Sequence, residues 1–268
     1  MGFAWQEVDW VLLDMDGEHY GFLVSSRSGA VADALDGAVV TTARSVSEPF
    51  RQGQTRLPKA AMATGFRVRF PDGTFVEDAA VLTPGSAILA RPGAGSRQGE
   101  VAGIREALGR FYGSIRAIEA PGTVDGGDIC DAEGHFFIGI SERTNEAGAR
   151  QLAGFLEKEG YTSSFVDIRN TGGILHLKSG IAHLGDRCLV LIDALAGREE
   201  FRGYDSVRVE ASEEYAANCV RVNDRVLIAA GVPVLEKLLV RLGIGVVPLE
   251  MSEFRKMDGG LSCLSLRF

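Results

Sequence analysis

A cysteine close to the end of the sequence, Cys263, is the first residue with clear chemical potential. It follows the pair Gly259-Gly260, and glycines let a ligand or a neighbouring backbone come close to a thiol. A thiolate is a strong nucleophile when a nearby base or cation favours its ionisation. A cysteine in an apolar strand is more often a buried core residue, so a nucleophilic role for Cys263 requires suitable partners elsewhere in the chain.

A histidine and three carboxylates could be those partners. His176 can transfer protons near neutral pH, and Asp125 can hold its imidazole in one tautomer, as the acid of a catalytic triad does. Glu77 and Asp78 would be unfavourable beside a thiolate unless a cation lay between them. Together these residue types indicate covalent thiol chemistry on a cationic substrate. Taken singly, a structural histidine and a solvated acidic turn are the simpler interpretations.

These candidates are far apart in sequence, and a repeated unit explains how they could meet. Over the last three quarters of the chain, a strand, a short polar segment, two strands joined by a turn, and a helix recur. The polar segments contain Asp78, Asp128, Lys178, Asn218 and Gly260, which are separated by 50, 50, 40 and 42 residues. Repeats of this length indicate radial repetition around a central axis, so we expect the polar segments to converge on one central pocket.

Hydrophobic periodicity predicts the individual elements. Apolar residues at helical spacing predict helices over 99–111, 145–159 and 233–242, with Phe111 and Leu242 on the buried faces of the first and the last. Alternating or continuous apolar runs predict strands over 10–13, 20–24, 38–43, 66–70, 75–82, 87–90, 115–118, 136–140, 163–168, 188–192, 207–210, 218–222, 226–229, 246–249 and 264–268.

Composition limits the classes of function. The 268 residues carry a formal net charge of −8, which argues against nucleic acid and anionic membranes as partners and is compatible with a cationic small molecule. No apolar run is long enough to predict a membrane span, and the first residues lack the pattern of a secretory signal. The widely spaced cysteines fit reduced thiols in a cytoplasmic protein. We expect structural roles for Cys130, Cys188, Cys219, His19, His135 and His183.

Several longer motifs resemble one family. They are Phe70–Asp78, Arg91-Pro92-Gly93 with Ser96-Arg97, Glu119–Thr123, Ile140-Ser141 with Arg143–Asn145, Leu175–Lys178, Tyr215–Cys219 and Lys256–Phe268. Over about residues 66–268 the chain resembles bacterial dimethylarginine dimethylaminohydrolases of the guanidino-group-modifying superfamily, also called the amidinotransferase or pentein superfamily. The tripeptide His-Leu-Lys at 176–178, where arginine deiminases typically have His-Leu-Asp, favours the dimethylarginine branch.

This resemblance implies an α/β fold, a five-bladed α/β propeller (pentein) with pseudo-fivefold ββαβ repeats around a central active site. Residues 1–268 would form a single α/β-propeller domain, and a homodimer is compatible with the family. Residues 1–65 would form an atypical first blade. The stretch from Arg44 to Gly65 is too short and too rich in glycine and proline to form the family's substrate lid and long helix.

The resemblance also implies roles for single residues. Cys263 would attack the guanidinium carbon, His176 would protonate the departing amine and then activate water, and Asp125 would support the histidine. Glu77 and Asp78 would hold the guanidinium nitrogens through charge-assisted hydrogen bonds. The other substrate contacts would come from Asp72 for the α-amino group, Arg97 and Arg143 for the α-carboxylate, and Phe75 and Met257 on the pocket wall. The scheme requires neither a metal nor an organic cofactor.

The activity implied by the resemblance is hydrolysis of Nω-methylated arginines (dimethylarginine) to citrulline and methylamines, through a covalent thiouronium-type intermediate on the cysteine. Two alternatives stay open. One is another guanidine-modifying activity, such as that of an arginine deiminase. The other is a non-catalytic methylarginine-binding protein or degenerate paralogue, which the departure at residues 1–65 keeps in consideration.

Overall fold

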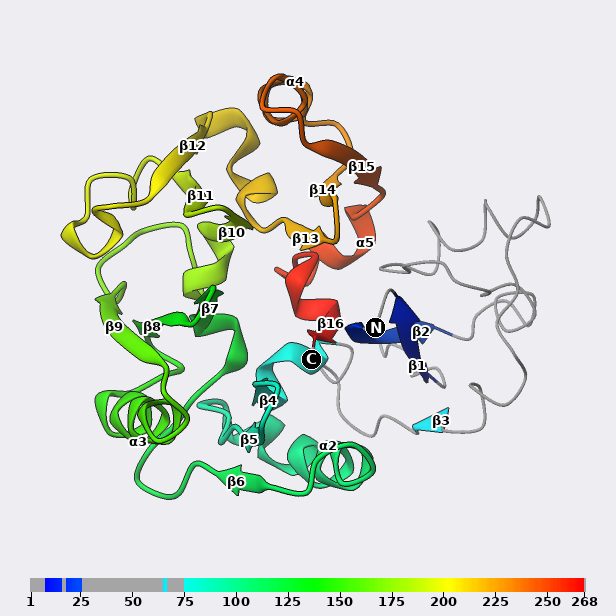
Figure 1. Ribbon diagram of the computed structural model, residues 1–268, viewed down its shortest axis with the longest axis vertical. Helices are drawn as coiled ribbons and strands as arrows, with labels where there is room; N and C mark the ends of the chain where they lie inside the picture. The colour runs from blue at the N-terminus through cyan, green and yellow to red at the C-terminus, as the bar shows by residue number, and fades with distance from the viewer. Residues whose placement is uncertain (1–7, 16–17, 26–64, 67–74, 268) are drawn as a thin grey trace.

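Five small β-sheets are the main feature of the part of the chain that the structure describes. The structure is a computed structural model, and it describes residues 8–15, 18–25, 65–66 and 75–267. The sheets lie around a common centre, with the longer helices on the outer side (Figure 1). The α/β fold with repeated sheet units that the sequence predicts is therefore confirmed.

Four of the sheets repeat one topology. Their strands are β4 (Ala80–Leu82), β5 (Ala87–Leu89) and β6 (Ile115–Ala117); β7 (Ile129–Ala132), β8 (His135–Ile140) and β9 (Thr162–Asp167); β10 (Ile181–Gly185), β11 (Cys188–Ile192) and β12 (Asp205–Val209); and β13 (Val220–Val222), β14 (Arg225–Ala229) and β15 (Gly245–Leu249). In each sheet the first two strands are antiparallel, and the third runs parallel to the second.

A parallel pair requires a crossover connection, and helices provide it. They are α2 (Val101–Leu108), α3 (Glu146–Glu157) and α4 (Pro233–Arg241). The crossover between β11 and β12 differs, because it contains only the short 3-10 helix η6 (Glu199–Phe201). This part of the sequence has charged residues and glycines where the other crossovers have apolar residues at helical spacing.

The remaining sheet joins both ends of the chain. Its strand order is β16 (Ser265–Arg267), β2 (Glu18–Ser25), β1 (Val8–Met15) and β3 (Gly65–Phe66), and every pair is antiparallel. The apolar alternation at the C-terminus thus predicts a paired strand correctly, although its first residue, Leu264, lies in a 3-10 turn. The strand expected over 38–43 and the second half of that expected over 66–70 lie outside the described residues.

Short 3-10 helices occupy the polar segments of the repeated unit. They are η2 (Val76–Ala79), η4 (Gly126–Asp128), η5 (Leu177–Ser179), η7 (Ala211–Ala217) and η8 (Ser262–Leu264). Each of the first four leads into the first strand of its sheet, and η8 leads into β16. Neighbouring members contact one another (η2 with η4 and η8, and η5 with η4 and η7). The repeated polar positions therefore meet, as the spacing predicts.

Helix α3 shows how local sequence sets these elements. Its N-cap Asn145 accepts a hydrogen bond from the Gly148 backbone N–H, which satisfies one of the free donors of the first turn. Ala149, Leu152 and Leu156 are fully buried against the sheet formed by β7, β8 and β9. Burial of a leucine stabilises the fold by about 1.5–3 kcal/mol. The chain leaves the helix through Gly160, whose φ is 89°.

Two helix ends and one strand differ from the prediction. Phe111 is 48% exposed and Leu242 is 57% exposed, because α2 and α4 end before these residues and the chain turns there. The predicted helix over 99–111 also begins late, since η3 (Gly95–Glu100) precedes α2 as a 3-10 helix. The strand predicted over 75–82 begins only at Ala80, after the polar turn of η2.

None of the helices in the described part of the chain combines the length and the apolar composition that a membrane crossing needs.

Candidate active site

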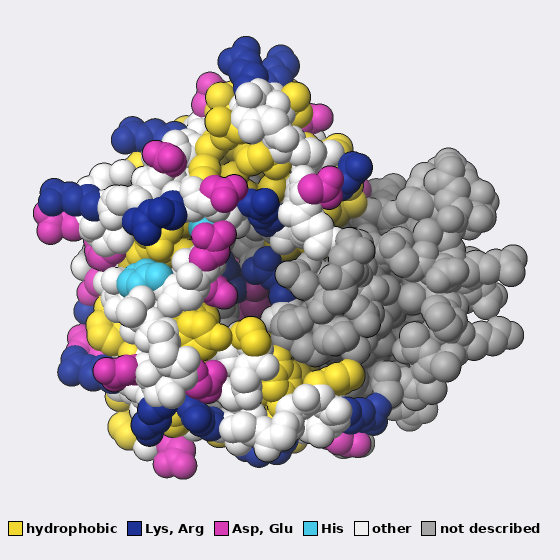
Figure 2. Space-filling model, in the orientation of Figure 1, with side chains coloured by type: hydrophobic (Ala, Val, Ile, Leu, Met, Phe, Trp, Pro, Cys, Tyr) yellow, Lys and Arg dark blue, Asp and Glu magenta, His cyan; other side chains and the backbone are white. Residues whose placement is uncertain are grey.

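The polar side chains of the 3-10 helices meet near the common centre of the sheets. In the space-filling view, basic and acidic side chains gather in a hollow there (Figure 2). Three of the five predicted chemical residues, Asp78, Asp125 and His176, have polar atoms within 4.8 Å of one another. They come from η2, from the residue before η4 and from the residue before η5.

His176 and Asp125 form the hydrogen-bonded pair that the sequence predicts. The Nε2 atom of His176 lies 3.2 Å from Oδ2 of Asp125, and the Gly93 backbone N–H donates to Oδ1 at 2.8 Å. Burial opposes the imidazolium, but the charge of Asp78 and the hydrogen bond with Asp125 outweigh it and raise the pKa of His176 to about 9. The imidazole is consequently protonated at neutral pH and can act as an acid.

Asp78 is held between two donors. Its Oδ1 accepts from the Gly127 backbone N–H at 2.8 Å, and its Oδ2 accepts from Nη1 of Arg97. Burial alone would raise the pKa of Asp78, but the charges of His176 and Arg97 and these hydrogen bonds lower it below the usual value. Arg97 also contacts Glu100 at 2.8 Å and donates to the Phe75 carbonyl at 3.0 Å. The carboxylate is thus ionised and fixed in direction.

Glu77 points to a different set of partners. Its Oε1 pairs with the ammonium of Lys178 from η5, and its Oε2 accepts from the Ser262 hydroxyl of η8 at 2.7 Å. Ser262 directly precedes Cys263. Glu77 therefore links two of the 3-10 helices and contacts the residue beside the predicted nucleophile.

Cys263 is half-buried, and its Sγ accepts a 3.4 Å hydrogen bond from the Gly260 backbone N–H. Burial, together with the charges of Glu77 and Asp78, raises the pKa of the thiol to about 12. The uncharged thiol is therefore the resting form at neutral pH. A cation bound between the carboxylates would reverse the electrostatic part of this effect.

Three glycines make the close packing of this region possible. A Cβ atom at Gly127 would lie 2.9 Å from Cγ of His176 and 2.9 Å from Oδ1 of Asp78. At Gly259 it would lie 2.2 Å from the ring of Phe75, and at Gly260 it would lie 2.4 Å from Cγ of Asn218. Side chains at these positions would displace the residues around them, so the glycines serve packing as well as turns.

The other predicted substrate contacts differ in how far they are buried, and one of them lies outside the described residues. Phe75 is buried beside Gly259. Arg143 is half-buried, and its guanidinium has no hydrogen-bond or ion-pair partner in the described part of the chain. Met257 follows the short helix α5 (Ser252–Arg255) and is 43% exposed. Asp72 lies outside the described residues.

Sequence reasoning assigned no role to three residues that organise the site. Asn218 donates to the Lys178 carbonyl at 3.0 Å and to the Ser262 hydroxyl at 3.1 Å, and it accepts from the Ser262 backbone N–H at 2.8 Å. Lys178 and Asn218 lie at repeated polar positions, so their spacing was an available signal. Ser262 has no such signal beyond its place next to Cys263.

Asp78, Asp125 and His176 are close enough together to be considered as a metal site. Their polar atoms already have partners within the protein, because Arg97 and Gly127 contact Asp78, and Gly93 and His176 contact Asp125. Hydrogen bonds within the chain therefore account for the arrangement of the cluster.

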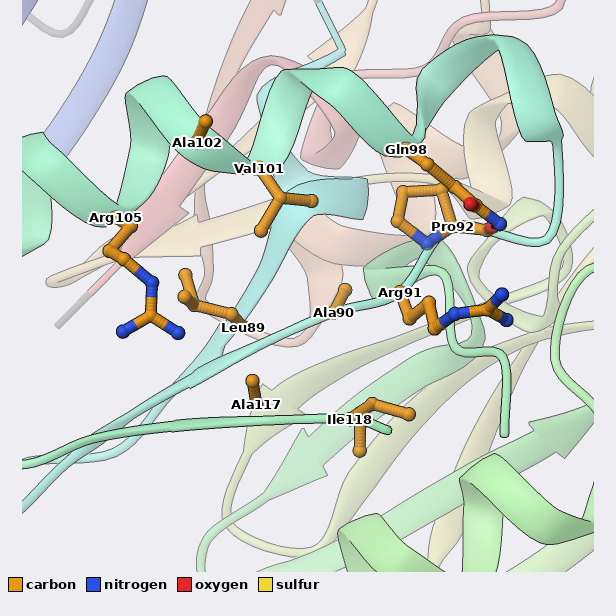
Figure 3. A pocket seen from close by; sticks show the side chains of 10 residues that line it. All are labelled: Leu89, Ala90, Arg91, Pro92, Gln98, Val101, Ala102, Arg105, Ala117 and Ile118. Carbon is orange, nitrogen blue, oxygen red and sulfur yellow. The ribbon is translucent and has the colours of Figure 1, made fainter. Parts of the chain in front are cut away.

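A separate pocket of about 270 Å³ lies between β5, β6 and the helical segment that includes α2 (Figure 3). Its ten lining residues, which include Arg91 and Arg105, contain none of the predicted site residues. Its wall is nevertheless connected to the site, since Pro92 in this wall precedes Gly93, the backbone donor to Asp125. The described chemistry is therefore located at the centre of the sheets, and this pocket is a distinct feature.

Comparison with known proteins identifies close relatives. No family model matches the chain. The N(G),N(G)-dimethylarginine dimethylaminohydrolase of Pseudomonas aeruginosa is 46% identical over 201 residues, which are 75% of this chain and 78% of the relative. The protein of the same name from Streptomyces coelicolor is 36% identical over 202 residues, which are 74% of each chain.

Solved structures agree with these relatives. A cysteine-to-serine variant of the Pseudomonas aeruginosa enzyme in complex with citrulline superimposes with a TM-score of 0.74 at 38% identity, covering 90% of this chain and 96% of that one. The N-terminal domain of ArgZ, an arginine dihydrolase from Cyanobacteria, superimposes with a TM-score of 0.68 at 21% identity, covering 75% of this chain and 77% of that one. At that identity the second match shows a shared fold.

Proposed function

Because the chain belongs to the dimethylarginine dimethylaminohydrolase family, we propose that it hydrolyses Nω-methylated arginines to citrulline and methylamines. One observation carries the proposal. A buried His176–Asp125 pair lies beside the ionised Asp78, and burial together with the charges of Glu77 and Asp78 raises the pKa of Cys263, a half-buried cysteine that a cationic substrate would activate.

Substrate binding is the first step. The guanidinium of the substrate lies against Asp78 and Glu77, which offer charge-assisted hydrogen bonds to its nitrogens. Arg143, whose guanidinium has no partner in the described part of the chain, binds the α-carboxylate. Arg97 is proposed to contribute to the same contact while it shares its guanidinium with Asp78 and Glu100.

The remaining contacts rest on the family resemblance. Asp72 is proposed to hold the α-amino group, and Phe75 and Met257 are proposed to line the pocket. Met257 is exposed, and Phe75 is buried beside Gly259. Phe75 would therefore line the inner part of the pocket wall, and Met257 would line its outer edge.

Covalent chemistry follows from the charges. The bound cation offsets Glu77 and Asp78, so the Cys263 thiol releases its proton to solvent and the thiolate attacks the guanidinium carbon. The tetrahedral adduct collapses when the bond to the methylated nitrogen breaks, and that nitrogen takes a proton from the imidazolium of His176. The products of this half-reaction are the free methylamine and a thiouronium group on Cys263.

Hydrolysis completes the cycle. His176 is now neutral and accepts a proton from water, which attacks the thiouronium carbon. The carbon–sulfur bond of this second tetrahedral adduct breaks, the proton of its hydroxyl group passes to the sulfur, and citrulline is released. Cys263 is then a thiol again, and His176 is an imidazolium through the proton it took from water. Asp125 keeps the imidazole in position in both steps through the 3.2 Å contact with Nε2.

A substrate panel tests the proposal. Purified protein is incubated with asymmetric and symmetric dimethylarginine, monomethylarginine and arginine, and both citrulline and the released amine are measured. We expect citrulline with a methylamine from at least one methylated arginine. Turnover of arginine alone would assign the chain to arginine deimination instead.

Two cysteine variants complete the panel. Cys263→Ser should abolish turnover with the fold intact, while Cys188→Ser, at a half-buried cysteine in β11, should leave it unchanged. If wild type and Cys263→Ser both bind methylarginine in calorimetry and neither releases citrulline, the chain is a binding protein.

The finer statements about partners and location are also proposals. The substrate is proposed to be a cationic small molecule, with no nucleic acid or membrane partner, because the chain carries a net charge of −8. A cytoplasmic location is compatible with the spaced, unpaired cysteines, and a homodimer is proposed from the family resemblance alone. Light scattering on the purified chain measures the oligomeric state.

A further inference from the structure

The ion pair between Lys178 and Glu77 is enclosed by the protein. The side chain of Lys178 is 12% exposed and that of Glu77 is 7% exposed. A surface lysine would gain little from such a pair and would lose side-chain freedom, whereas a buried carboxylate without a counter-ion is strongly unfavourable. The ammonium of Lys178 is therefore the counter-ion of Glu77 in the interior.

This pair is connected to the nucleophile through one residue. The second oxygen of Glu77 accepts from the Ser262 hydroxyl at 2.7 Å, and Ser262 precedes Cys263 in η8. Asn218 closes the network, since it contacts the Lys178 carbonyl at 3.0 Å and both the hydroxyl and the backbone N–H of Ser262. A shift of Lys178 is therefore transmitted to the turn that carries the thiol.

We propose that Lys178 is a positioning residue for the nucleophile: its ammonium holds Glu77 against Ser262 and places a positive charge near the Cys263 thiol. The role assumes the reaction proposed above, in which Cys263 attacks the substrate. It is distinct from substrate binding, because Lys178 acts through Glu77 and Ser262.

The charged groups around the thiol predict in which direction the loss of Lys178 changes the pKa of Cys263. The thiol interacts electrostatically with Glu77 and Asp78 of η2, with Lys178 of η5 and with the phenol of Tyr215 of η7. The carboxylates disfavour the thiolate and Lys178 favours it. The hydrogen bond from the Gly260 backbone N–H also favours the thiolate. Without the ammonium one of these two favourable interactions is lost, so the pKa of Cys263 rises further.

Alkylation of the substrate-free protein tests this role. The rate at which iodoacetamide modifies Cys263 is followed by mass spectrometry of its peptide over about pH 6 to 11. This range lies below the midpoint of the thiol, where the rate follows the thiolate fraction. A rise of about one pH unit in the pKa of Cys263 should therefore make the modification of Lys178→Met about tenfold slower than that of wild type. Lys178→Arg should restore most of the rate, and Lys237→Met, at an exposed lysine of α4, should match wild type.

Two further variants, in which the charge of Glu77 is also removed, ensure that the test does not depend on Lys178→Met alone. Glu77→Gln should move the profile to lower pH, and Glu77→Gln combined with Lys178→Met should return it close to wild type. Circular dichroism establishes that each variant is folded, and Lys178→Gln replaces Lys178→Met if the latter does not fold. A folded Lys178→Met or Lys178→Gln protein whose profile superimposes on that of wild type overturns the role.

The outcome separates the two proposals. The alkylation contains no substrate, so a Lys178-dependent profile in a chain that releases no citrulline overturns the proposed function and leaves the charge effect standing. Normal turnover of methylarginine together with superimposed profiles overturns the role of Lys178 alone.

Discussion

At the scale of single residues, His176 is the group whose charge state the surroundings determine most clearly. Asp78, Asp125 and Asp128 all favour the imidazolium, and together they raise the pKa of His176 to about 9 despite its burial. An imidazolium present before the reaction can protonate the leaving amine without first taking a proton from the thiol. Acid catalysis therefore precedes base catalysis at this residue.

The charge on His176 should also make stability depend on pH. Its pKa is higher in the folded chain than the unfolded value of 6.5, so its contribution is fully present below about pH 6.5 and is lost as the pH rises through about 9. We expect His176→Gln to lower the free energy of unfolding by about 2–3 kcal/mol more at pH 6 than at pH 10, measured by urea unfolding.

A second histidine provides the control for this measurement. Burial and Arg187 lower the pKa of His135, so His135→Gln should show no extra destabilisation at pH 6. Equal losses for His176→Gln at both pH values would contradict the raised pKa of His176.

Asp125 should also influence the pKa of His176. Its hydrogen bond and its charge favour the imidazolium, so Asp125→Asn should lower the pKa of His176 and move the alkaline limb of the kcat/KM profile to lower pH. Loss of the oriented acid should also reduce kcat by about 10²- to 10⁴-fold. Asp125→Glu, which keeps the charge, should lose less. An unchanged alkaline limb in Asp125→Asn would show that another group titrates there.

At this scale sequence reasoning is most informative where a residue type has few uses. A cysteine after a glycine pair, a histidine and an acidic pair at repeated positions limit the chemistry before any contact is known. Lys178 and Ser262 were assigned no role because lysine and serine are common on surfaces. The repeated position marks Lys178 as a member of the site, but the contacts of both residues with Glu77 are needed to show what they do. The direction in which Glu77 points depends on packing between η2, η5 and η8, which no local pattern encodes.

At the scale of elements, the 3-10 helices position the site, and their glycines permit it. A Cβ atom at Gly127 would contact both His176 and Asp78 at 2.9 Å. Gly127→Ala should therefore destabilise the fold by about 1–3 kcal/mol and, by displacing the imidazole, lower kcat/KM by about 10²-fold. Chemical unfolding and the citrulline assay measure the two effects.

Gly154 in α3 provides the control for this glycine-to-alanine substitution. Apart from the adjacent residues and the backbone of its own helix, no atom lies within 4 Å of a Cβ placed there, and alanine is favoured over glycine in a helix by about 0.5–1 kcal/mol. Gly154→Ala should stabilise the chain and leave kcat/KM unchanged. A Gly127→Ala protein as active as Gly154→Ala would show that the turn tolerates the methyl group.

The elements also show where sequence patterns are sufficient. Strands β8, β11 and β14 are continuous apolar runs and were predicted to within a residue or two. The 3-10 helices were predicted only as polar interruptions, because turns this short lack a period that could be recognised. Phe111 and Leu242 were misplaced because apolar spacing continues past the residues where α2 and α4 end.

At the scale of the whole molecule, hydrogen bonds at the centre and hydrogen bonds between outer parts of neighbouring sheets serve different purposes. Asn218 joins η5 to η8 beside the nucleophile. Glu159, just after α3, accepts from Thr83 at 2.7 Å and from Ser86 at 2.5 Å in the turn between β4 and β5, which ties one sheet to the next. The repeat predicts that sheets are neighbours, but it does not predict which side chains join them.

This division leads to a prediction about one variant of each kind. Thr83→Val removes the hydrogen bond to the Glu159 carboxylate and the two hydrogen bonds between the Thr83 hydroxyl and the Ser86 backbone. The loss of the charged partner alone should lower the free energy of unfolding by about 1.5–3 kcal/mol, with kcat/KM within about twofold of wild type. Asn218→Ala should lower both stability and kcat/KM, because it releases Lys178 and Ser262. Thr162→Val, at an exposed threonine that contacts His135, should change neither, as expected for the surface. If Thr83→Val reduced turnover as much as Asn218→Ala, the contacts between neighbouring sheets would control the geometry of the centre, and stability and catalysis could not be separated by position in this fold.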